Sequence, residues 1–335
     1  MKRNLVIFRL NKAEVVTKVI KKKRINMPKR IVITGATGMI GTRVTKELID
    51  RGDEVIIFSR SPQRAKNVIK GAKEYVLWTQ NAKREMIWED SLEGVDAVIH
   101  LSGENVMSKR WNDEHKQNIL NSRIDTTKAL VDALAEVKKK PEVFICASAI
   151  GYYGSSEEKE FDEYSEAGND FLAGVVKQWE EEARRVGEYS IRYIGIRTGI
   201  VLDKNEGALA RMLTPFKFLI GGPLGNGKQW FPWIHINDVV GIYLHALDNP
   251  KVNGVLNAAA PEFITMKKFC ETLGSIMHRP SFFRVPAFVL RILFGEGADI
   301  LVKGAKVFPK KTIDSGYEFE YESIEPALRN LLKNI

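Results

Sequence analysis

The most constraining feature of the sequence is a short apolar run that leads into three glycines and then into an amphipathic helix. Ile31–Thr34 is rich in β-branched residues and predicts a buried strand. Gly35, Gly38 and Gly41 follow in the spacing G-x-x-G-x-x-G, and Met39–Asp50 places apolar side chains on one helical face. A strand, a tight turn and a helix in this order are typical of the first unit of a parallel α/β fold.

A turn of this kind can hold the pyrophosphate of a dinucleotide. The glycines let the backbone approach the phosphates and let the helix pack close to the sheet, while the helix N-terminus offers unpaired N–H groups. The alternative is a plain βα turn without a ligand; the strand and helix on either side favour the binding site. The residues expected to contact the cofactor here are Gly35, Thr37, Gly38, Met39, Ile40 and Gly41.

The end of the next apolar strand, Glu54–Ser59, bears on the choice of dinucleotide. A site for NAD(H) usually places Asp or Glu at this strand end, where it binds the ribose 2′-hydroxyl. Here Ser59 is followed by Arg60, and Arg64 comes one helical turn later. Two guanidinium groups can bind a 2′-phosphate, so the sequence predicts NADP(H) rather than NAD(H). The alternative is that both arginines are ordinary surface charges.

Strands and helices continue to alternate along the chain, which predicts an α/β fold with a doubly wound parallel sheet of the Rossmann type. The next expected strands are 73–78, 96–101, 143–147, 191–196 and 254–258, and the long helices among them are 113–137 and 169–185. Ligands of such sheets bind at the carboxyl ends of the strands. Cofactor contacts are therefore expected at Leu101, Ser102, Gly103, Ala147 and Arg197.

The alternation weakens after residue 200, which suggests a second, smaller unit. We assign 27–200 to the NADP-binding domain, with 231–258 returning to it, and 201–230 and 259–335 to a mainly C-terminal substrate domain. Residues 231–236 predict a strand, and Asn237 and Asp238 resemble the N-cap of the helix that follows. His235 lies within this apolar strand and is expected to be a hydrogen-bonded core residue.

The net charge of +9 is concentrated at the N-terminus, because residues 1–26 hold nine basic residues and one acidic residue. The rest of the chain is nearly neutral, so nucleic acid is not an expected partner, although a basic tail that binds it remains a third interpretation. Residues 1–26 are a basic arm, a targeting arm or an extension upstream of a natural start at Met27. We favour the last, since the first strand begins almost at once.

Composition sets further bounds on the class of protein. Only two cysteines occur, Cys146 and Cys270, both in apolar surroundings, which favours a reducing, cytoplasmic compartment over a disulfide framework. No stretch reaches transmembrane length, so no membrane partner is expected. The five histidines form no metal-ligand spacing, and no metal is expected.

Several motifs together give the chain a family resemblance. TGATGMIG, VIHLSG, SAIGYYG, RTGIVLD and WIHINDVV resemble an extended short-chain dehydrogenase/reductase. GENVMSKRW, NSRI and GAKVFPKKTIDSGYEF are similar to its atypical NADP-binding subgroup, the sugar-nucleotide-epimerase-like "epimerase family proteins". The resemblance runs from about Pro28 to Leu332. It implies a Rossmann domain with a small substrate domain, and a possible homodimer that pairs through the two long helices.

The chain departs from the family at the residues that carry proton transfer. Active extended members have a serine and then Tyr-x-x-x-Lys on the next helix, where the lysine lowers the pKa of the tyrosine. Matched to that pattern, the serine position falls on Ala149, the tyrosine position on Leu172 and the lysine position on Val176. Arg123 replaces an asparagine that extended members often carry, and could reach a phosphate or the catalytic loop.

Three nearby residues are candidates to replace the missing group. Tyr152 and Tyr153 lie on the loop after the fifth strand, and a phenol with a lowered pKa can act as a general acid. The alternative, held equally, is that both rings pack against the pocket wall and are structural. Ser148 can bind a substrate or the carboxamide, or cap the strand end.

The sequence therefore predicts an NADP(H)-binding oxidoreductase or epimerase-like enzyme. Its small-molecule substrate, a carbonyl or hydroxyl compound, is not identified by any motif. The alternative is a non-catalytic NADPH-binding sensor or partner-binding protein, which the missing Tyr-x-x-x-Lys favours. The "epimerase" label follows fold similarity and does not by itself define the reaction.

Overall fold

A computed structural model describes residues 27–79 and 88–333. Its centre is a seven-stranded, all-parallel sheet with the order β10-β7-β5-β4-β1-β2-β3. This order confirms the predicted doubly wound α/β fold. The basic segment 1–26 lies outside the described residues. The strands are β1 (Arg30–Thr34), β2 (Glu54–Ser59), β3 (Glu74–Leu77), β4 (Ala97–His100), β5 (Val143–Ala149), β7 (Arg192–Thr198) and β10 (Gly254–Ala258).

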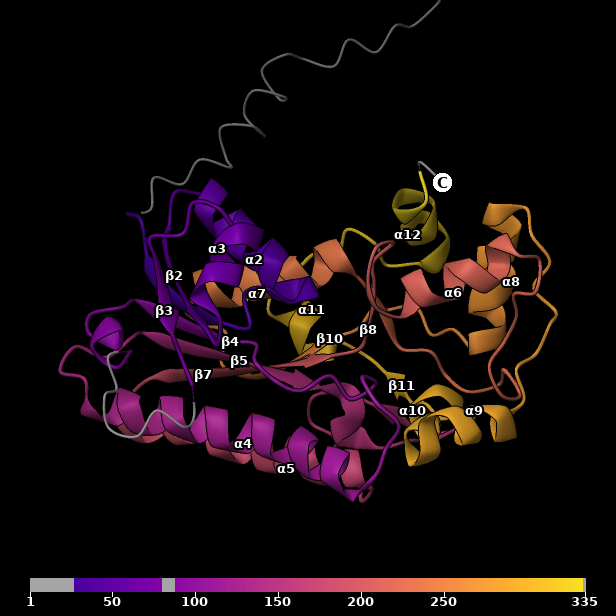
Figure 1. Cartoon of the computed structure of the whole chain (residues 1–335), viewed down its shortest axis with the longest axis horizontal. Helices are drawn as coiled ribbons and strands as arrows, with labels where there is room; N and C mark the ends of the chain where they lie inside the picture. Colours follow the sequence, from indigo (N-terminus) through magenta and orange to yellow (C-terminus); the bar gives the residue numbers. More distant parts are fainter. Residues whose placement is uncertain (1–26, 80–87, 334–335) are drawn as a thin grey trace, which may run out of the picture.

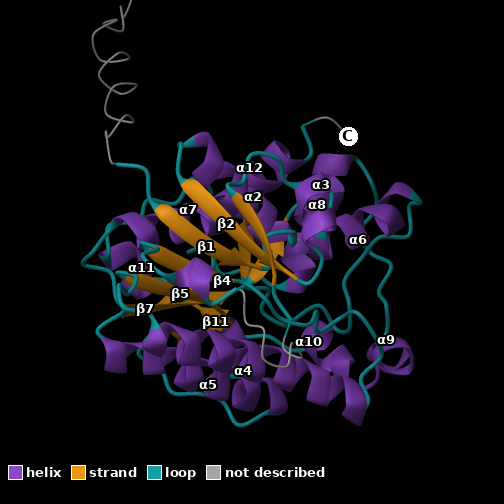
Figure 2. Ribbon diagram, turned by 60° about the vertical axis from the view of Figure 1, so that its left-hand side comes forward, coloured by secondary structure: helices purple, strands orange, loops and turns teal. Residues whose placement is uncertain are grey.

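Helices cover both faces of the sheet (Figures 1 and 2). On one face lie α2 (Met39–Asp50), α3 (Pro62–Val68) and α7 (Ile236–Asp248), and on the other lie α4 (Asp113–Glu136) and α5 (Phe171–Arg184). Side chains alternate between the two layers along each strand, as the pleat requires. Ile31 and Ile33 of β1 belong to one apolar cluster and Val32 to the other, and all three are fully buried.

The remaining elements gather beyond the carboxyl ends of the strands (Figure 1). Two small parallel pairs lie there, β6 (Glu160–Phe161) with β11 (Lys306–Val307) and β8 (Ile200–Leu202) with β9 (Trp233–His235). The helices of this part are α6 (Gly207–Lys217), α8 (Met266–Met277), α9 (Ala287–Phe294), α10 (Asp299–Val302) and α12 (Ile324–Leu331). The short helix α11 (Lys310–Asp314) instead packs beside β10 of the main sheet. The expected strand at 231–236 thus forms, but it pairs with β8 outside the main sheet.

The loop after β4 is fastened to this C-terminal part. The Trp111 N–H donates to the carbonyl of Phe294 at 3.1 Å, and the Arg110 guanidinium donates to the carbonyl of Ile292. The Trp111 indole packs edge-on against Phe171 at a centroid distance of 5.4 Å. The loop at the carboxyl edge of the sheet therefore contacts the end of α9.

The start of α7 corrects one expectation. His235, not Asn237 or Asp238, is the N-cap, and its Nδ1 accepts the N–H of Asn237 at 3.0 Å. Burial lowers the pKa of His235 to about 4, so its ring is neutral and has a lone pair to accept with. His235 is a buried, hydrogen-bonded core residue, as expected.

Asp238 instead fastens a distant segment of the chain. Its carboxylate accepts the N–H of Glu320 at 2.7 Å, the N–H of Tyr321 at 3.0 Å and the hydroxyl of Tyr317 at 3.1 Å. These partners lie about 80 residues further on, so no local pattern identifies them. Asp238 is buried and joins α7 to the segment before α12.

None of the helices within 27–79 and 88–333 combines the length and the apolar character needed to cross a bilayer. In the same ranges, His, Cys, Asp and Glu form no group of three or more that could hold a metal ion.

Asp238→Ala should lower the free energy of unfolding by about 2–4 kcal/mol, because several donors lose their buried acceptor. Asp248→Ala is the matched control on the same helix. Asp248 forms partly exposed ion pairs with Arg51 and Lys29, so its loss should cost less than about 1 kcal/mol. Urea denaturation of both variants measures the difference, and equal losses would contradict the role assigned to Asp238.

Candidate functional site

The glycine turn between β1 and α2 leaves no room for side chains at two positions. Gly35 has φ +66°, and a Cβ there would lie 2.7 Å from the carbonyl carbon of Leu101. A Cβ on Gly41 would lie 2.2 Å from the carbonyl oxygen of Gly35. The turn therefore packs directly on the chain leaving β4, and α2 packs directly on the turn.

The outer side of this turn has the properties of an anion site. Thr37 and Gly38 are exposed, and Met39 and Ile40 are half-buried. The first bond within the helix runs from the Thr42 N–H to the Gly38 carbonyl at 2.8 Å, so the preceding amides make no intrahelical bonds. These N–H groups and the helix dipole favour a phosphate.

The carboxyl end of β2 lies beside the turn, because β2 pairs with β1 in parallel register. Ser59 is half-buried, and Arg60 and Arg64 are exposed. From Ser59 to Val68 the chain contains no Asp or Glu. The charge around this strand end is therefore positive, as the preference for a 2′-phosphate requires.

A chain of buried hydrogen bonds runs under the turn. The Thr34 Oγ1 accepts the N–H groups of Leu101 and Ser102 at 3.2 and 3.3 Å, and lies 2.7 Å from Nδ1 of His100. The Nε2 of His100 lies 3.1 Å from the Thr127 Oγ1. The half-buried Leu101 and Ser102 and the exposed Gly103 are thereby held next to Gly35.

The partners of Thr127 fix the protonation of this histidine. Thr127 Oγ1 donates to the Arg123 carbonyl at 2.7 Å and accepts the Trp179 Nε1–H at 3.0 Å. His100 must then donate from Nε2 and accept at Nδ1. Burial lowers the pKa of His100 to about 3, which is consistent with a neutral ring.

Arg123 lies beneath the loop that follows β4. Its guanidinium donates to the carbonyls of Ile119 at 2.9 Å and Glu104 at 3.0 Å, and its Cζ lies 5.1 Å from the centre of the Trp179 ring. Burial lowers the pKa of Arg123 to about 10. The Arg123 guanidinium therefore holds the loop after β4 from below. The expected contact of Arg123 with a cofactor phosphate stays a prediction.

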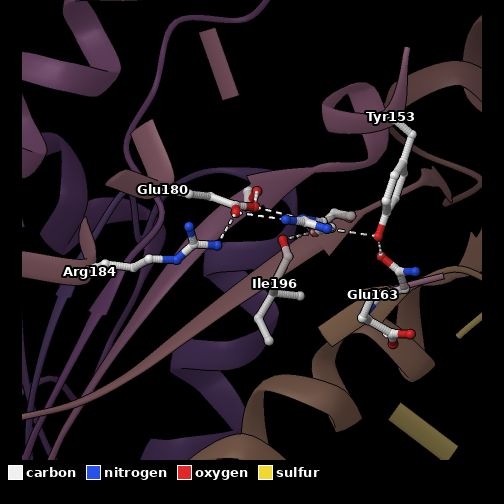
Figure 3. A network of polar contacts seen from close by, with 9 residues as sticks. Tyr153, Glu163, Glu180, Arg184 and Ile196 are labelled. Atoms are coloured by element: carbon white, nitrogen blue, oxygen red, sulfur yellow. Dashed lines mark hydrogen bonds and ion pairs between the residues drawn. The ribbon is translucent and has the colours of Figure 1, made fainter. Parts of the chain in front are cut away.

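Arg197 and Glu180 form a buried ion pair at the carboxyl ends of β5 and β7 (Figure 3). Arg197 is 1% exposed and donates to both carboxylate oxygens of Glu180, at 2.8 and 2.9 Å. Ser148 Oγ donates to the same carboxylate at 2.6 Å, and Arg184 donates at 2.8 Å. Burial alone would lower the pKa of Arg197, but the bonds to Glu180 outweigh it and raise that pKa.

Tyr153 extends this network away from the surface. Its buried hydroxyl accepts from Arg197 at 3.0 Å and donates to Oδ1 of Asn257 at 2.7 Å (Figure 3). The Asn257 N–H in turn donates to Glu163 at 2.9 Å. Burial raises the pKa of Tyr153, so the lowered pKa that a general acid of this kind needs is not found at this residue.

Tyr152 packs with its ring against the guanidinium of Arg197. The Arg197 Cζ is 3.4 Å from the centre of the Tyr152 ring, and the two tyrosine rings meet edge-on at 5.4 Å. Tyr152 is half-buried, and its hydroxyl forms none of the side-chain hydrogen bonds found among residues 27–79 and 88–333. Of the three candidates for proton transfer, Tyr152 is the one whose polar group is not bound within the network.

Comparison with known proteins identifies the family. Residues 31–259 match the model of the NAD dependent epimerase/dehydratase family. The chain belongs to this family. Residues 285–331 match a second model, a domain of unknown function named DUF1731, which covers α9 to α12.

Relatives of this family resemble the chain over nearly its full length. Epimerase family protein SDR39U1 of Mus musculus is 39% identical over 307 residues, covering 90% of this chain and 99% of that protein. Epimerase family protein YfhF of Bacillus subtilis is 37% identical, covering 90% and 97%. The crystal structure of human SDR39U1 (isoform 2) with NADPH superposes with a TM-score of 0.81 at 35% identity, covering 91% and 100%.

The departure from the usual family pattern is visible in the structure. A Cβ on Gly151, in the loop after β5, would lie 3.5 Å from the Cβ of Leu172. Val176, one turn further along α5, is buried. The positions matched to the tyrosine and the lysine therefore present apolar side chains next to the SAIGYYG loop.

Sequence reasoning did not identify several residues that hold the site together. Thr34 and His100 are polar residues at the ends of apolar strands, which is a usable signal. Asn257 and Glu163 contact partners about 50 to 150 residues away, and nothing local marks them. Glu180 anchors α5 to β7 through its ion pair with Arg197.

The neutral His100 makes stability depend on pH. Its folded pKa lies below that of an unfolded histidine, so its contribution is complete above about pH 6.5 and is lost as the pH falls toward 3. His100→Gln should therefore remove up to about 1.4 kcal/mol per pH unit from the slope of unfolding free energy between about pH 6 and 4.

Urea denaturation at several pH values measures this slope. His278→Asn is the control, because His278 is exposed and adopts φ +54°, which asparagine tolerates. An unchanged slope in His100→Gln would show that His100 is not the buried neutral group described here.

Proposed function

We propose that the chain binds NADP(H) across the β1–α2 turn, with the pyrophosphate on the N–H groups that begin α2. The observation that carries this proposal is the exposed helix N-terminus beside Arg60 and Arg64, in a segment without acidic residues. The absence of space for a Cβ at Gly35 and Gly41 fits a backbone cradle. The human relative crystallised with NADPH supports the same choice of cofactor.

The remaining contacts follow from the strand order. Gly103, Leu101 and Ser102 border the turn at the end of β4, and Ala147 is half-buried at the end of β5. We assign Arg123 and Arg197 to positioning, because their guanidinium groups already bind carbonyls or Glu180. Under this assignment, Arg123 and Arg197 act on the cofactor indirectly, by holding the loops that border it.

The reaction proposed is hydride exchange between the nicotinamide and a carbon of a small carbonyl or hydroxyl compound. When bound, NADPH supplies the hydride. The carbonyl oxygen takes a proton from the Tyr152 hydroxyl, which water then reprotonates. Arg197, against the face of the Tyr152 ring, stabilises the phenolate formed in between. Ser148 and Tyr153 keep Arg197 and Glu180 in place.

A second function is favoured by the apolar Leu172 and Val176 and by the bound hydroxyl of Tyr153. In this alternative the chain binds NADPH without turnover, and cofactor occupancy orders a surface for a partner. The free thiols of Cys146 and Cys270 are buried, which suits either function in a reducing cytoplasmic compartment.

Replacing both arginines, in Arg60→Ala/Arg64→Ala, should weaken NADPH binding by about 10- to 100-fold, because each guanidinium loses charge-assisted bonds to the 2′-phosphate. NADH binding should change little. Calorimetric titration of both nucleotides at one ionic strength measures the effect. Lys66→Ala is the control, because it removes an exposed positive charge from the same helix, α3. Equal affinity of the wild type for NADPH and NADH would contradict the assignment.

Tyr152→Phe and Tyr153→Phe should separate chemistry from structure. Tyr152→Phe should abolish NADPH oxidation by a panel of small carbonyl compounds while leaving NADPH affinity and stability unchanged. Tyr153→Phe should retain turnover but lose about 1–3 kcal/mol of stability, since Arg197 and Asn257 lose a buried partner. Full turnover in Tyr152→Phe would remove this residue from the mechanism, and wild-type NADPH binding without any oxidation would favour the sensor.

A further inference from the structure

Large apolar side chains are exposed mainly on one edge of the C-terminal part. Of the thirteen exposed in the described residues, eight lie directly after α6, in the loop before α9 or on α9 itself. Phe218, Phe282, Phe288 and Ile292 are each 64–72% exposed. We call this set the apolar edge: Phe218, Leu219, Ile220, Phe282, Phe283, Phe288, Ile292 and Leu293.

The segments that carry the apolar edge lie side by side. The Phe283 N–H donates to the Gly221 carbonyl at 3.2 Å, and Val285 forms bonds of 3.0 and 2.9 Å with Pro223 and Gly225. The chain from Gly221 therefore runs along the chain from Phe283, and Pro286 then begins α9. In Figure 1, α6, α8, α9 and the loop from α8 to α9 lie on the side of the molecule away from the sheet, with α6 above and α9 below.

The chain directly after α6 presents three consecutive apolar residues, Phe218, Leu219 and Ile220, which are 51–72% exposed. Leu219 has φ +64° because it caps α6: its N–H donates to the Phe216 carbonyl at 3.1 Å, and the Ile220 N–H donates to the Pro215 carbonyl at 3.0 Å, as in a Schellman cap. The cap therefore fixes the backbone that carries these three side chains.

The charge of the same segments is entirely positive. No Asp or Glu occurs from 207 to 237, which contains Arg211, Lys217 and Lys228, or from 272 to 295, which contains Arg279, Arg284 and Arg291. The acidic groups that follow are paired, Glu296 with Lys116 and Asp299 with Arg291 and Lys303. Among the described residues, the basic side chains of these segments that form no ion pair are therefore Arg211, Lys217, Lys228, Arg279 and Arg284. Two copies of this surface would repel each other, whereas an anionic surface would be attracted.

We propose that the apolar edge docks on the surface of an anionic lipid bilayer. The phenylalanine and isoleucine side chains would lie at the boundary of headgroups and acyl chains, with the arginines and lysines among the phosphates. This is binding to a membrane surface without a spanning helix. It revises the expectation that no membrane is a partner, and it does not depend on the proposed NADP(H) reaction.

The test is flotation of the full chain with vesicles of phosphatidylcholine, with and without about one-third phosphatidylglycerol. The wild type should bind the anionic vesicles and bind less as salt is raised. Phe288→Ser/Ile292→Ser should weaken that binding at least about tenfold, because both exposed side chains lose their contact with the acyl chains. Val68→Ser/Tyr164→Ser removes exposed apolar side chains elsewhere and should bind as the wild type.

Three results would overturn the proposal. One is the absence of binding to anionic vesicles. A second is full binding by Phe288→Ser/Ile292→Ser, which would mean that charge alone, including that of residues 1–26, accounts for the attraction. The third is a self-association of the wild type, seen by light scattering without vesicles and lost in the same variant, which would assign the edge to a second copy of the chain.

Discussion

The buried pair of Arg197 and Glu180 determines how the candidate site is built. Two opposite charges in an apolar interior are stable only when all their donors and acceptors are satisfied. The chain meets this condition with residues from β5, α5 and the loop after β5, so these elements cannot move independently. The need to satisfy the pair also engages the hydroxyl of Tyr153, whereas Tyr152 meets Arg197 with the face of its ring.

The structure agrees with sequence reasoning wherever the signal is local. α2 and β2 begin and end at the residues expected, because glycines, apolar periodicity and β-branched residues define them directly. The cap of α7 and the pairing of β9 were not predicted, since they depend on a neutral buried histidine and on a distant strand. In the site, the glycine turn is readable from the sequence, whereas the partners of Tyr153 lie 44 and 104 residues away from it and emerge only on folding.

The homodimer expected from the family resemblance stays a prediction. The family resemblance suggested pairing through α4 and α5, yet none of the large exposed apolar side chains among the described residues lies on either helix. Their outer faces are polar and charged, with Lys128, Asp132 and Arg185 linked at the surface. Exposed apolar area, the usual mark of an obligate interface, is found instead on the C-terminal part, where its positive charge favours a different occupant.

The bonds from Arg110 and Trp111 to the carbonyls that end α9 have a consequence for how the two ends of the molecule communicate. The loop that carries them starts at Gly103, beside the glycine turn, while α9 carries the outermost apolar residues. Docking of α9 on a membrane surface, as proposed, would therefore act on the loop that leads back to the glycine turn. Thermodynamic linkage makes any such effect reciprocal. The factor by which docking at the apolar edge changes the affinity for the nucleotide equals the factor by which bound nucleotide changes the affinity for the docking surface.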